Sequence, residues 1–263
     1  METIFIKEGD NLQEKIDEAI LKSSKLVIKK GLYETTPLFI KGALTLEFEE
    51  GATLLATTNE ALYQNIKTRV AGIEMEWYPA LLNVIGTSNV TIKGQGILDG
   101  NGPYWWNKYW GLDMKGGYRK IYDEKGLRFA ADYDCKRPRN LLVQNSSNVK
   151  IYDITSTSSG FWNIHILYSN DILIENVKIK SEAINSPSTD GIDIDSSYNV
   201  VVNKVETNCN DDSVCIKSGR DFDGIRVGRP SHDITISNSI INKGFGVTIG
   251  SEISGGVYNV NIS

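Results

Sequence analysis

The sequence predicts an all-β protein that coils as a parallel β-helix, and three observations lead to this prediction. First, a motif recurs in which Asn or Asp is followed by apolar residues that alternate with variable ones, the pattern of a strand with one face against a core. Second, the last four steps between these motifs are 23, 28, 34 and 26 residues, long enough for a full coil of short strands and turns. Third, 24 glycines among many Asn, Ser and Thr residues suit a chain of strands and turns. The motifs begin at Asn89, Asn148, Asp171, Asn199, Asp233 and Asn259.

The first eighty residues differ from the repeats. Asn11 followed by Glu14 predicts a capping box at the start of a short helix, which would cover the open end of the β-helix. Its apolar face would consist of Leu12, Ile16, Ala19 and Ile20. Strand-like runs follow at residues 25–28 and 44–48. We predict one domain over residues 1–263, with the cap and first coils in 1–80 and the central coils in 81–263.

Composition narrows the class of protein. With 40% hydrophobic residues the chain can bury a substantial core, and its net charge of −5 argues against nucleic acid as a partner. No run of 18 apolar residues is present, and the N-terminus lacks the basic start and long apolar stretch of a signal peptide. We therefore expect no membrane partner and a cytoplasmic location for the sequence as it stands, while secretion stays open if the sequence has been trimmed. The oligomeric state is left open.

The cysteines and the aromatic residues each have a simple interpretation. The three cysteines show no Cys-x-x-Cys spacing, so we expect free thiols, with Cys209 and Cys215 in the core, and neither a cofactor nor a metal. Between Gly100 and Cys135 the repeat is interrupted by a segment dense in aromatic residues, including Trp105, Trp106 and Trp110. Such rings could be platforms for sugar faces or a buried cluster that anchors a long loop, and both interpretations stay open.

Three carboxylates in two short turns are the strongest candidates for chemistry. Asp190 lies in one turn and the pair Asp211-Asp212 in another, 21 positions further for Asp211. If these turns fall on adjacent coils, the side chains are stacked roughly 4.8 Å apart along the coil axis. Two adjacent like charges are unfavourable unless a cation, a proton or a function offsets them. A calcium site is one alternative, and a protonated acid with one or two bases for cleavage of a glycosidic bond is the other.

Several segments together resemble glycoside hydrolase family 28, the polygalacturonase family, from about residue 10 to the end. The resemblance is carried by Ser188-Thr189-Asp190-Gly191, Asn210-Asp211-Asp212, the segment 244–251, the segment 94–100 followed by Trp105-Trp106, and the segments 137–140 and 161–165. It implies a right-handed parallel β-helix that hydrolyses galacturonic acid linkages in pectin with inversion at the anomeric carbon. By position, Asp211 would be the general acid, and Asp190 and Asp212 would be the bases that activate water.

The sequence departs from the family pattern at three places. Ser188 stands where the family usually has Asn, and we expect a small effect. Phe245 stands where the family has a His beside the catalytic carboxylates, so the acid is tuned by burial alone, or the substrate differs, or activity is low. We place Phe245 among the substrate-binding residues. The family's basic Arg-Ile-Lys segment would follow about one coil after residues 255–256, and we interpret the chain as truncated at its C-terminal coils.

Basic residues that follow the Asp pair could hold an acidic sugar in place of that segment. Lys217 and Arg220 are the candidates, in a stretch that continues to Arg226 and Arg229 and that could equally be a solvated loop. Trp106 and His165 complete the predicted substrate-binding set, although His165 could also be a structural residue of a strand.

The sequence therefore predicts an inverting glycoside hydrolase that acts on pectic oligo- or polysaccharides. Two alternatives stay open. One is a polysaccharide lyase on the same architecture, in which the Asp pair would bind calcium and a Lys or Arg would abstract a proton. The other is a non-catalytic β-helix that binds carbohydrate or has a structural role. The choices between internal and end cleavage, and between homogalacturonan and rhamnogalacturonan, are not made by the sequence.

Overall fold

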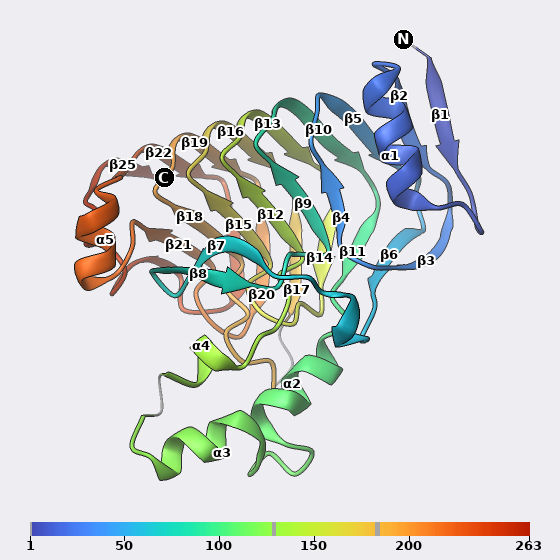
Figure 1. Ribbon diagram of the computed structural model, residues 1–263. Coiled ribbons are helices and arrows are strands. Elements are labelled where there is room, and N and C mark those ends of the chain that lie inside the picture. Colours follow the sequence, from blue (N-terminus) through green and yellow to red (C-terminus); the bar gives the residue numbers. More distant parts are fainter. Residues whose placement is uncertain (1, 128–129, 182–184) are drawn as a thin grey trace.

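The computed structural model describes residues 2–127, 130–181 and 185–263. It is a right-handed parallel β-helix (Figure 1). Its coils stack along one axis, and their strands form three parallel sheets. The predicted fold class is confirmed. The first sheet contains β1 (Thr3–Ile6), β2 (Lys25–Ile28), β5 (Leu44–Phe48), β10 (Ser88–Gly94), β13 (Ser147–Tyr152), β16 (Asn170–Glu175), β19 (Tyr198–Asn203), β22 (Ser231–Ser237) and β25 (Val257–Ile262), in this order.

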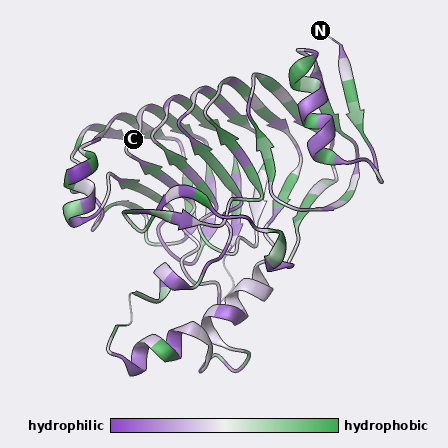
Figure 2. Cartoon of the chain, viewed as in Figure 1, coloured by the Kyte–Doolittle hydropathy of each residue, from purple (hydrophilic) through white to green (hydrophobic). Residues whose placement is uncertain are grey.

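The other two sheets complete each coil. The second sheet contains β3 (Gly31–Thr35), β6 (Ala52–Ala56), β11 (Ile97–Asp99), β14 (Thr155–Thr157), β17 (Lys178–Ser181), β20 (Glu206–Cys209) and β23 (Ile240–Lys243). The third contains β4 (Leu38–Ile40), β9 (Leu82–Ile85), β12 (Leu141–Gln144), β15 (Ile164–Leu167), β18 (Ile192–Asp195), β21 (Val214–Lys217) and β24 (Val247–Ile249). Inward-facing Ile, Leu and Val residues of the three sheets form one continuous core, and Figure 2 shows hydrophobic residues recurring along the strands among hydrophilic ones.

The repeat motifs form strands of the first sheet, and the backbone conformation of their first residue explains why. The Asn or Asp of each motif has a left-handed backbone, with φ of 61° at Asn89, 50° at Asn148 and 53° at Asn199. Asn and Asp tolerate this conformation better than other residues with a side chain. Their side chains also bond from coil to coil, because the Asn148 amide donates to Asn89 Oδ1 at 2.7 Å. The motif therefore sets both the turn and the stacking of coils.

The predicted capping helix is α1 (Leu12–Leu21), which packs against β1, β2 and β4. The Glu14 backbone N–H donates to Asn11 Oδ1 at 3.3 Å, and the Asn11 amide donates to the Glu14 carboxylate at 2.9 Å, so the capping box is confirmed. Its buried residues are Leu12, Ile16 and Ala19.

Several segments lie outside the coils of the β-helix (Figure 1). They are η1 (Glu60–Leu62), the antiparallel hairpin β7 (Ile66–Val70) and β8 (Ile73–Trp77), and the helices α2 (Gly102–Trp110), α3 (Gly117–Glu124), α4 (Ala131–Asp134) and α5 (Asp221–Val227). The hairpin lies against the outer face of the third sheet, where Arg69 pairs with Asp195 at 2.8 Å. None of the helices in the described ranges has the length and apolar character needed to cross a bilayer.

All three cysteines are free, as predicted, and all three are buried. Cys209 belongs to the core, but Cys215 does not, because it faces outward from β21. Its neighbours Val214 and Ile216 take the inward positions on that strand. Cys215 is buried as predicted, but outside the main core cluster, and it lies beside the carboxylates described next.

Candidate active site

The three candidate carboxylates converge where two adjacent strands of the third sheet begin. Asp190 lies two residues before β18, and Asp211 and Asp212 lie three and two residues before β21. One carboxylate oxygen from each of these three aspartates lies within 4.8 Å of the chosen oxygens of the other two. The register pairs Ile192 with Val214, so Asp190 is aligned with Asp212, and one coil here has 22 residues. The predicted step of 21, which aligned Asp190 with Asp211, is one residue short.

Close backbone packing holds the two turns together. The Gly191 N–H donates to the Asp212 carbonyl at 2.8 Å, and the Asn210 N–H donates to the Thr189 hydroxyl at 3.2 Å. A Cβ atom at Gly191 would lie 2.3 Å from the Ser213 carbonyl oxygen, so only glycine allows this approach. Ser188 has φ 54° and its hydroxyl donates to Asp132 at 3.1 Å. The Ser-Thr-Asp-Gly motif thus fixes the position of Asp190 relative to the next coil.

Asp211 has the properties of a proton donor. It is partly exposed, and burial together with the neighbouring Asp212 carboxylate raises the pKa of Asp211 to about 6. Its Oδ1 accepts a bond from the Asp212 backbone N–H at 3.0 Å. Asp212, also partly exposed, accepts a bond from the Thr248 hydroxyl at 2.7 Å. A proton on Asp211 next to an acceptor on Asp212 is the arrangement that acid–base cleavage needs.

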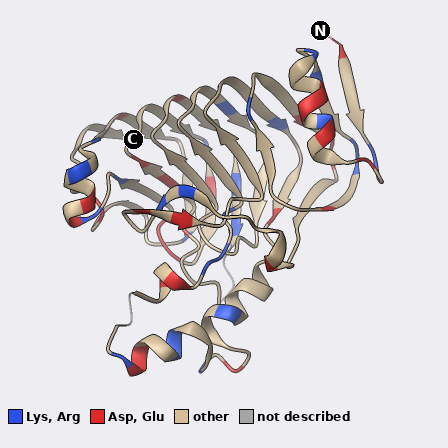
Figure 3. Cartoon of the chain, viewed as in Figure 1, with Lys and Arg blue, Asp and Glu red and all other residues tan. Residues whose placement is uncertain are grey.

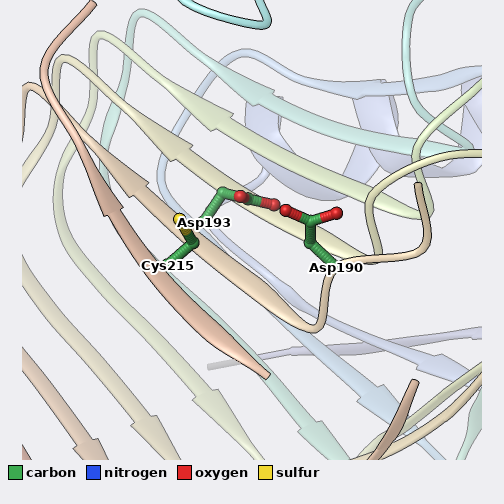
Figure 4. Close-up of side chains that lie close together, drawn as sticks. All are labelled: Asp190, Asp193 and Cys215. Atoms are coloured by element: carbon green, nitrogen blue, oxygen red, sulfur yellow. The ribbon is translucent and has the colours of Figure 1, made fainter. Parts of the chain in front are cut away.

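Asp190 lies deeper and faces a second carboxylate that the sequence analysis did not single out. Asp190 is 4% exposed, and Asp193 on β18 is fully buried. Figure 4 shows the two carboxylates pointing toward each other, with Cys215 beside them. Burial, and after it the Asp193 charge, raises the pKa of Asp190 well above its usual range. Burial likewise raises the pKa of Asp193 to about 7. The pair therefore retains protons at a pH where isolated aspartates lose them.

Lys217 is the counter-ion of this buried group. Its ammonium lies 3.2 Å from Asp193 Oδ1, 3.3 Å from Glu252 Oε1 and 3.5 Å from Asp190 Oδ2, and 4.1 Å from the centroid of the Trp162 ring. Burial alone would lower the pKa of Lys217, but the three carboxylates raise it well above its usual range. Lys217 was predicted to bind substrate, and the structure places it beneath the site, where it holds Asp190.

Glu252 and Asp193 are charged residues of the site that sequence reasoning missed. A signal for Asp193 was present, because Ile192-Asp193-Ile194-Asp195 alternates on a strand whose isoleucines face the core. Two charges are then forced onto the outer face of the third sheet. No comparable local pattern marks Glu252.

His165 is fully buried on the outer face of β15 and has no exposed surface for a substrate. Its Nδ1 lies 2.7 Å from the Arg139 guanidinium and its Nε2 lies 3.5 Å from Asp195. Burial lowers the pKa of His165 to about 4, so the ring is neutral near pH 7. The structure supports the structural alternative for His165, in place of the predicted substrate contact.

Trp106, like His165, is a buried structural residue and does not offer its ring to a sugar. Its side chain lies in α2, is 5% exposed, and donates its indole N–H to the Ser159 carbonyl at 2.8 Å. The predicted sugar contact has no free ring face here. Of the two interpretations of the aromatic segment, the buried cluster is the one that the structure supports for Trp105 and Trp106.

Arg220 and Phe245 lie at the edge of the site. Arg220 donates to the Tyr133 hydroxyl at 3.0 Å and lies 3.6 Å from Glu252, with 28% of its side chain exposed. Phe245 is 77% exposed, and its backbone N–H donates to the Asp211 carbonyl at 3.0 Å. Both remain available to a ligand that reaches Asp211.

The chain is similar to polygalacturonases in sequence and in structure. It is 28% identical over 245 residues to a probable polygalacturonase of Vitis vinifera, covering 90% of this chain and 46% of that protein. It is 27% identical to an endo-polygalacturonase of Pectobacterium parmentieri, covering 86% of this chain and 53% of that protein. The chain thus spans about half the length of these curated relatives.

Among solved structures, the exopolygalacturonase of Thermotoga maritima superposes with a TM-score of 0.84 at 28% identity, covering 99% of this chain and 66% of that one. A polygalacturonase of Erwinia carotovora has a TM-score of 0.73 at 23% identity, which supports the fold alone. The family model of "Glycosyl hydrolases family 28" matches residues 55–263, the part that contains all three converging carboxylates. The chain belongs to glycosyl hydrolase family 28.

Proposed function

We propose that the protein hydrolyses galacturonic acid linkages in pectin, with Asp211 as general acid and with Asp190 and Asp212 as the bases that hold and activate water. The observation that carries this proposal is the convergence of three carboxylates within 4.8 Å, one of which has a pKa of about 6. A group with such a pKa is protonated on the acid side of neutrality and can still release its proton in the reaction.

The proton balance of the reaction fits these positions. Asp211 gives its proton to the glycosidic oxygen as the bond to the anomeric carbon breaks. Water attacks that carbon and gives a proton to Asp190 or Asp212. The carboxylates return to their starting forms by exchange with solvent. Lys217 balances the change of charge at Asp190 from a distance of 3.5 Å, without contacting the sugar.

Inversion is proposed from family membership. The chosen carboxylate oxygens lie within 4.8 Å, which is shorter than the roughly 6.5 to 9.5 Å separation that is usual between the two carboxyl groups of inverting enzymes. We therefore place the attacking water beside the Asp190–Asp212 pair instead of between two opposed carboxyl groups. Proton NMR of the first product formed from oligogalacturonides tests this, because inversion yields the β-anomer from an α-linkage.

Analysis of the reaction products separates hydrolysis from the two alternatives. Hydrolysis releases reducing ends without ultraviolet absorption, whereas a lyase yields an unsaturated, absorbing product that depends on calcium. Lys217 is unsuited to be a lyase base, because its three carboxylates keep it protonated. Binding of oligogalacturonides without any new reducing ends would instead support a non-catalytic module, and would overturn the proposed function.

A further inference from the structure

A cavity lies apart from the carboxylates, between the β7–β8 hairpin, α5 and the ends of two strands of the third sheet. Its volume is about 690 Å³, within the range of pockets that hold small ligands. The residues used below, Lys67, Gln144, Tyr168, Arg226 and Arg229, all line it. None of the three candidate catalytic aspartates is among its lining residues.

The strand register separates this cavity from the candidate active site. Gln144 is the last residue of β12, and Tyr168 follows the last residue of β15. Asp190 precedes β18 and so lies toward the opposite ends of the same strands. Along the strand direction, Asp190 and Gln144 are separated by five residues of extended chain, which is about 16 Å. Buried Arg69, paired with Asp195, joins the hairpin to the sheet at the level of Gln144.

Gln144 supplies an unmatched acceptor at the base of the cavity. Its side chain is 8% exposed, and its amide nitrogen donates to the Lys67 carbonyl at 3.0 Å. That bond fixes the amide, yet Oε1 is buried and has no hydrogen-bond partner in the described part of the chain. An unpaired buried acceptor is unfavourable, so a hydrogen-bond donor from a ligand would be stabilised there.

Arg229 supplies an unmatched positive charge at the rim. Its guanidinium carbon lies 5.0 Å from the centroid of the Tyr168 ring, and Arg69 lies 4.9 Å from the same ring. Within residues 2–127, 130–181 and 185–263, no carboxylate forms an ion pair with Arg229. By contrast, Arg226 is neutralised by Glu74 at 2.6 Å and by Asp223 at 2.7 Å. Figure 3 shows charges of both signs on α5, in agreement with this local neutralisation.

Lys67 adds a third cationic side chain to the lining, and Glu76 adds a carboxylate at the register position opposite Lys67 on the hairpin. Arg229 is then the surplus charge. We propose that this cavity is a second carbohydrate site that takes an acidic sugar, with the sugar carboxylate at Arg229 and a sugar hydroxyl donating to Gln144 Oε1. The planar guanidinium matches a carboxylate, and the hydroxyl matches the lone acceptor. The choice of galacturonate as the acidic sugar rests on the proposed function.

Isothermal titration with trigalacturonate tests this proposal on the Asp211→Asn variant, which is not expected to consume the ligand. We expect two binding events, one of which weakens about 10- to 100-fold in the Arg229→Gln variant. The neutral galactotriose should not produce that event. The matched control is Lys178→Gln, which removes an exposed lysine of the second sheet and should leave both events unchanged.

The outcomes separate this proposal from the proposed function. If wild-type protein releases reducing ends but no binding event responds to Arg229→Gln, the second site is overturned while the hydrolase proposal stands. If the Arg229-dependent event remains but no hydrolysis and no second event are found, the second site stands alone. Equal binding of galactotriose, or equal weakening by Lys178→Gln, would also overturn the second site.

Discussion

Lys217 and Asp193 form a buried ion pair of 3.2 Å beside the candidate catalytic carboxylates, with 6% and 0% of their side chains exposed. Asp190 and Glu252 share the same ammonium, so three carboxylates surround one cation. The pair is therefore part of a group that must hold at least one proton to limit its negative charge. Burial, and after it the Asp193 charge, raises the pKa of Asp190, the proposed base, while Lys217 opposes this shift.

Replacement of Asp193 by Asn should shift the pH dependence of hydrolysis. The Asp193 charge contributes to the raised pKa of Asp190, so its removal lowers that pKa. The base form of Asp190 then exists at lower pH, and the acid limb of the kcat profile moves to lower pH. Asp17→Asn, an exposed change on α1, should leave the profile unchanged. A loss of rate in Asp193→Asn with the same pH limits would contradict this role.

Replacement of Asp211 by Asn should remove the general acid while the fold remains. We expect hydrolysis of polygalacturonate to fall roughly 10²- to 10⁴-fold, the effect of losing a positioned acid. Reducing-end release measures the activity, and circular dichroism with urea unfolding checks the fold. A loss of less than about tenfold in a folded variant would mean that Asp211 is not the acid.

Activity should be highest on the acid side of neutrality. Because burial and Asp212 raise the pKa of Asp211 to about 6, its proton is present below that pH and is lost above it. The rate of a step that needs this proton therefore falls as pH rises through about 6. Measurement of kcat/KM across this range tests the assignment. A rate that stays constant or rises through neutral pH would be incompatible with Asp211 as the donor.

Much of the fold and the central carboxylates could be predicted because local residues determine them. Each Asn or Asp of the repeat adopts the left-handed turn by itself, so the coils are readable from the sequence. The two Asp motifs lie on adjacent coils for the same reason. The hairpin was missed because its two-residue turn, Ala71-Gly72, has positive φ at both positions without the Asn-Gly signal usual there.

The environment of each side chain could not be predicted in the same way. Trp106 and His165 have the residue types of a sugar site, but their burial depends on α2 and on the hairpin that covers the third sheet. The contacts of Lys217 join β18, β21 and residue Glu252, which are far apart in sequence. Only the register of the coils shows that the charged side chains of Asp193, Lys217 and Glu252 lie in contact.

Removal of the charge of Lys217 should destabilise the protein more at high pH than at low pH. In Lys217→Met, the buried carboxylates of Asp190, Asp193 and Glu252 lose their cation, which is unfavourable by about 3 to 5 kcal/mol while they stay ionised. At low pH Asp190 and Asp193, whose pKa values are raised by burial, can be neutralised by protons instead, so the loss is smaller. Urea unfolding at about pH 5 and pH 8 measures the difference, with Lys178→Met as an exposed control. An equal loss at both pH values would show that the ion pairs do not determine the effect.

Replacement of Phe245 by His should show whether this exposed ring limits the reaction. Phe245 is 77% exposed beside Asp211, and its ring cannot donate a proton or carry charge. A histidine there places a titratable group next to the proposed acid, so we expect a higher kcat on polygalacturonate if the present site lacks only that group. If the apolar ring instead binds the substrate, Phe245→His raises KM with kcat unchanged, while Phe245→Tyr retains the ring and the original KM. Steady-state kinetics of both variants distinguish these results, and an unchanged kcat and KM in Phe245→His would remove Phe245 from the site.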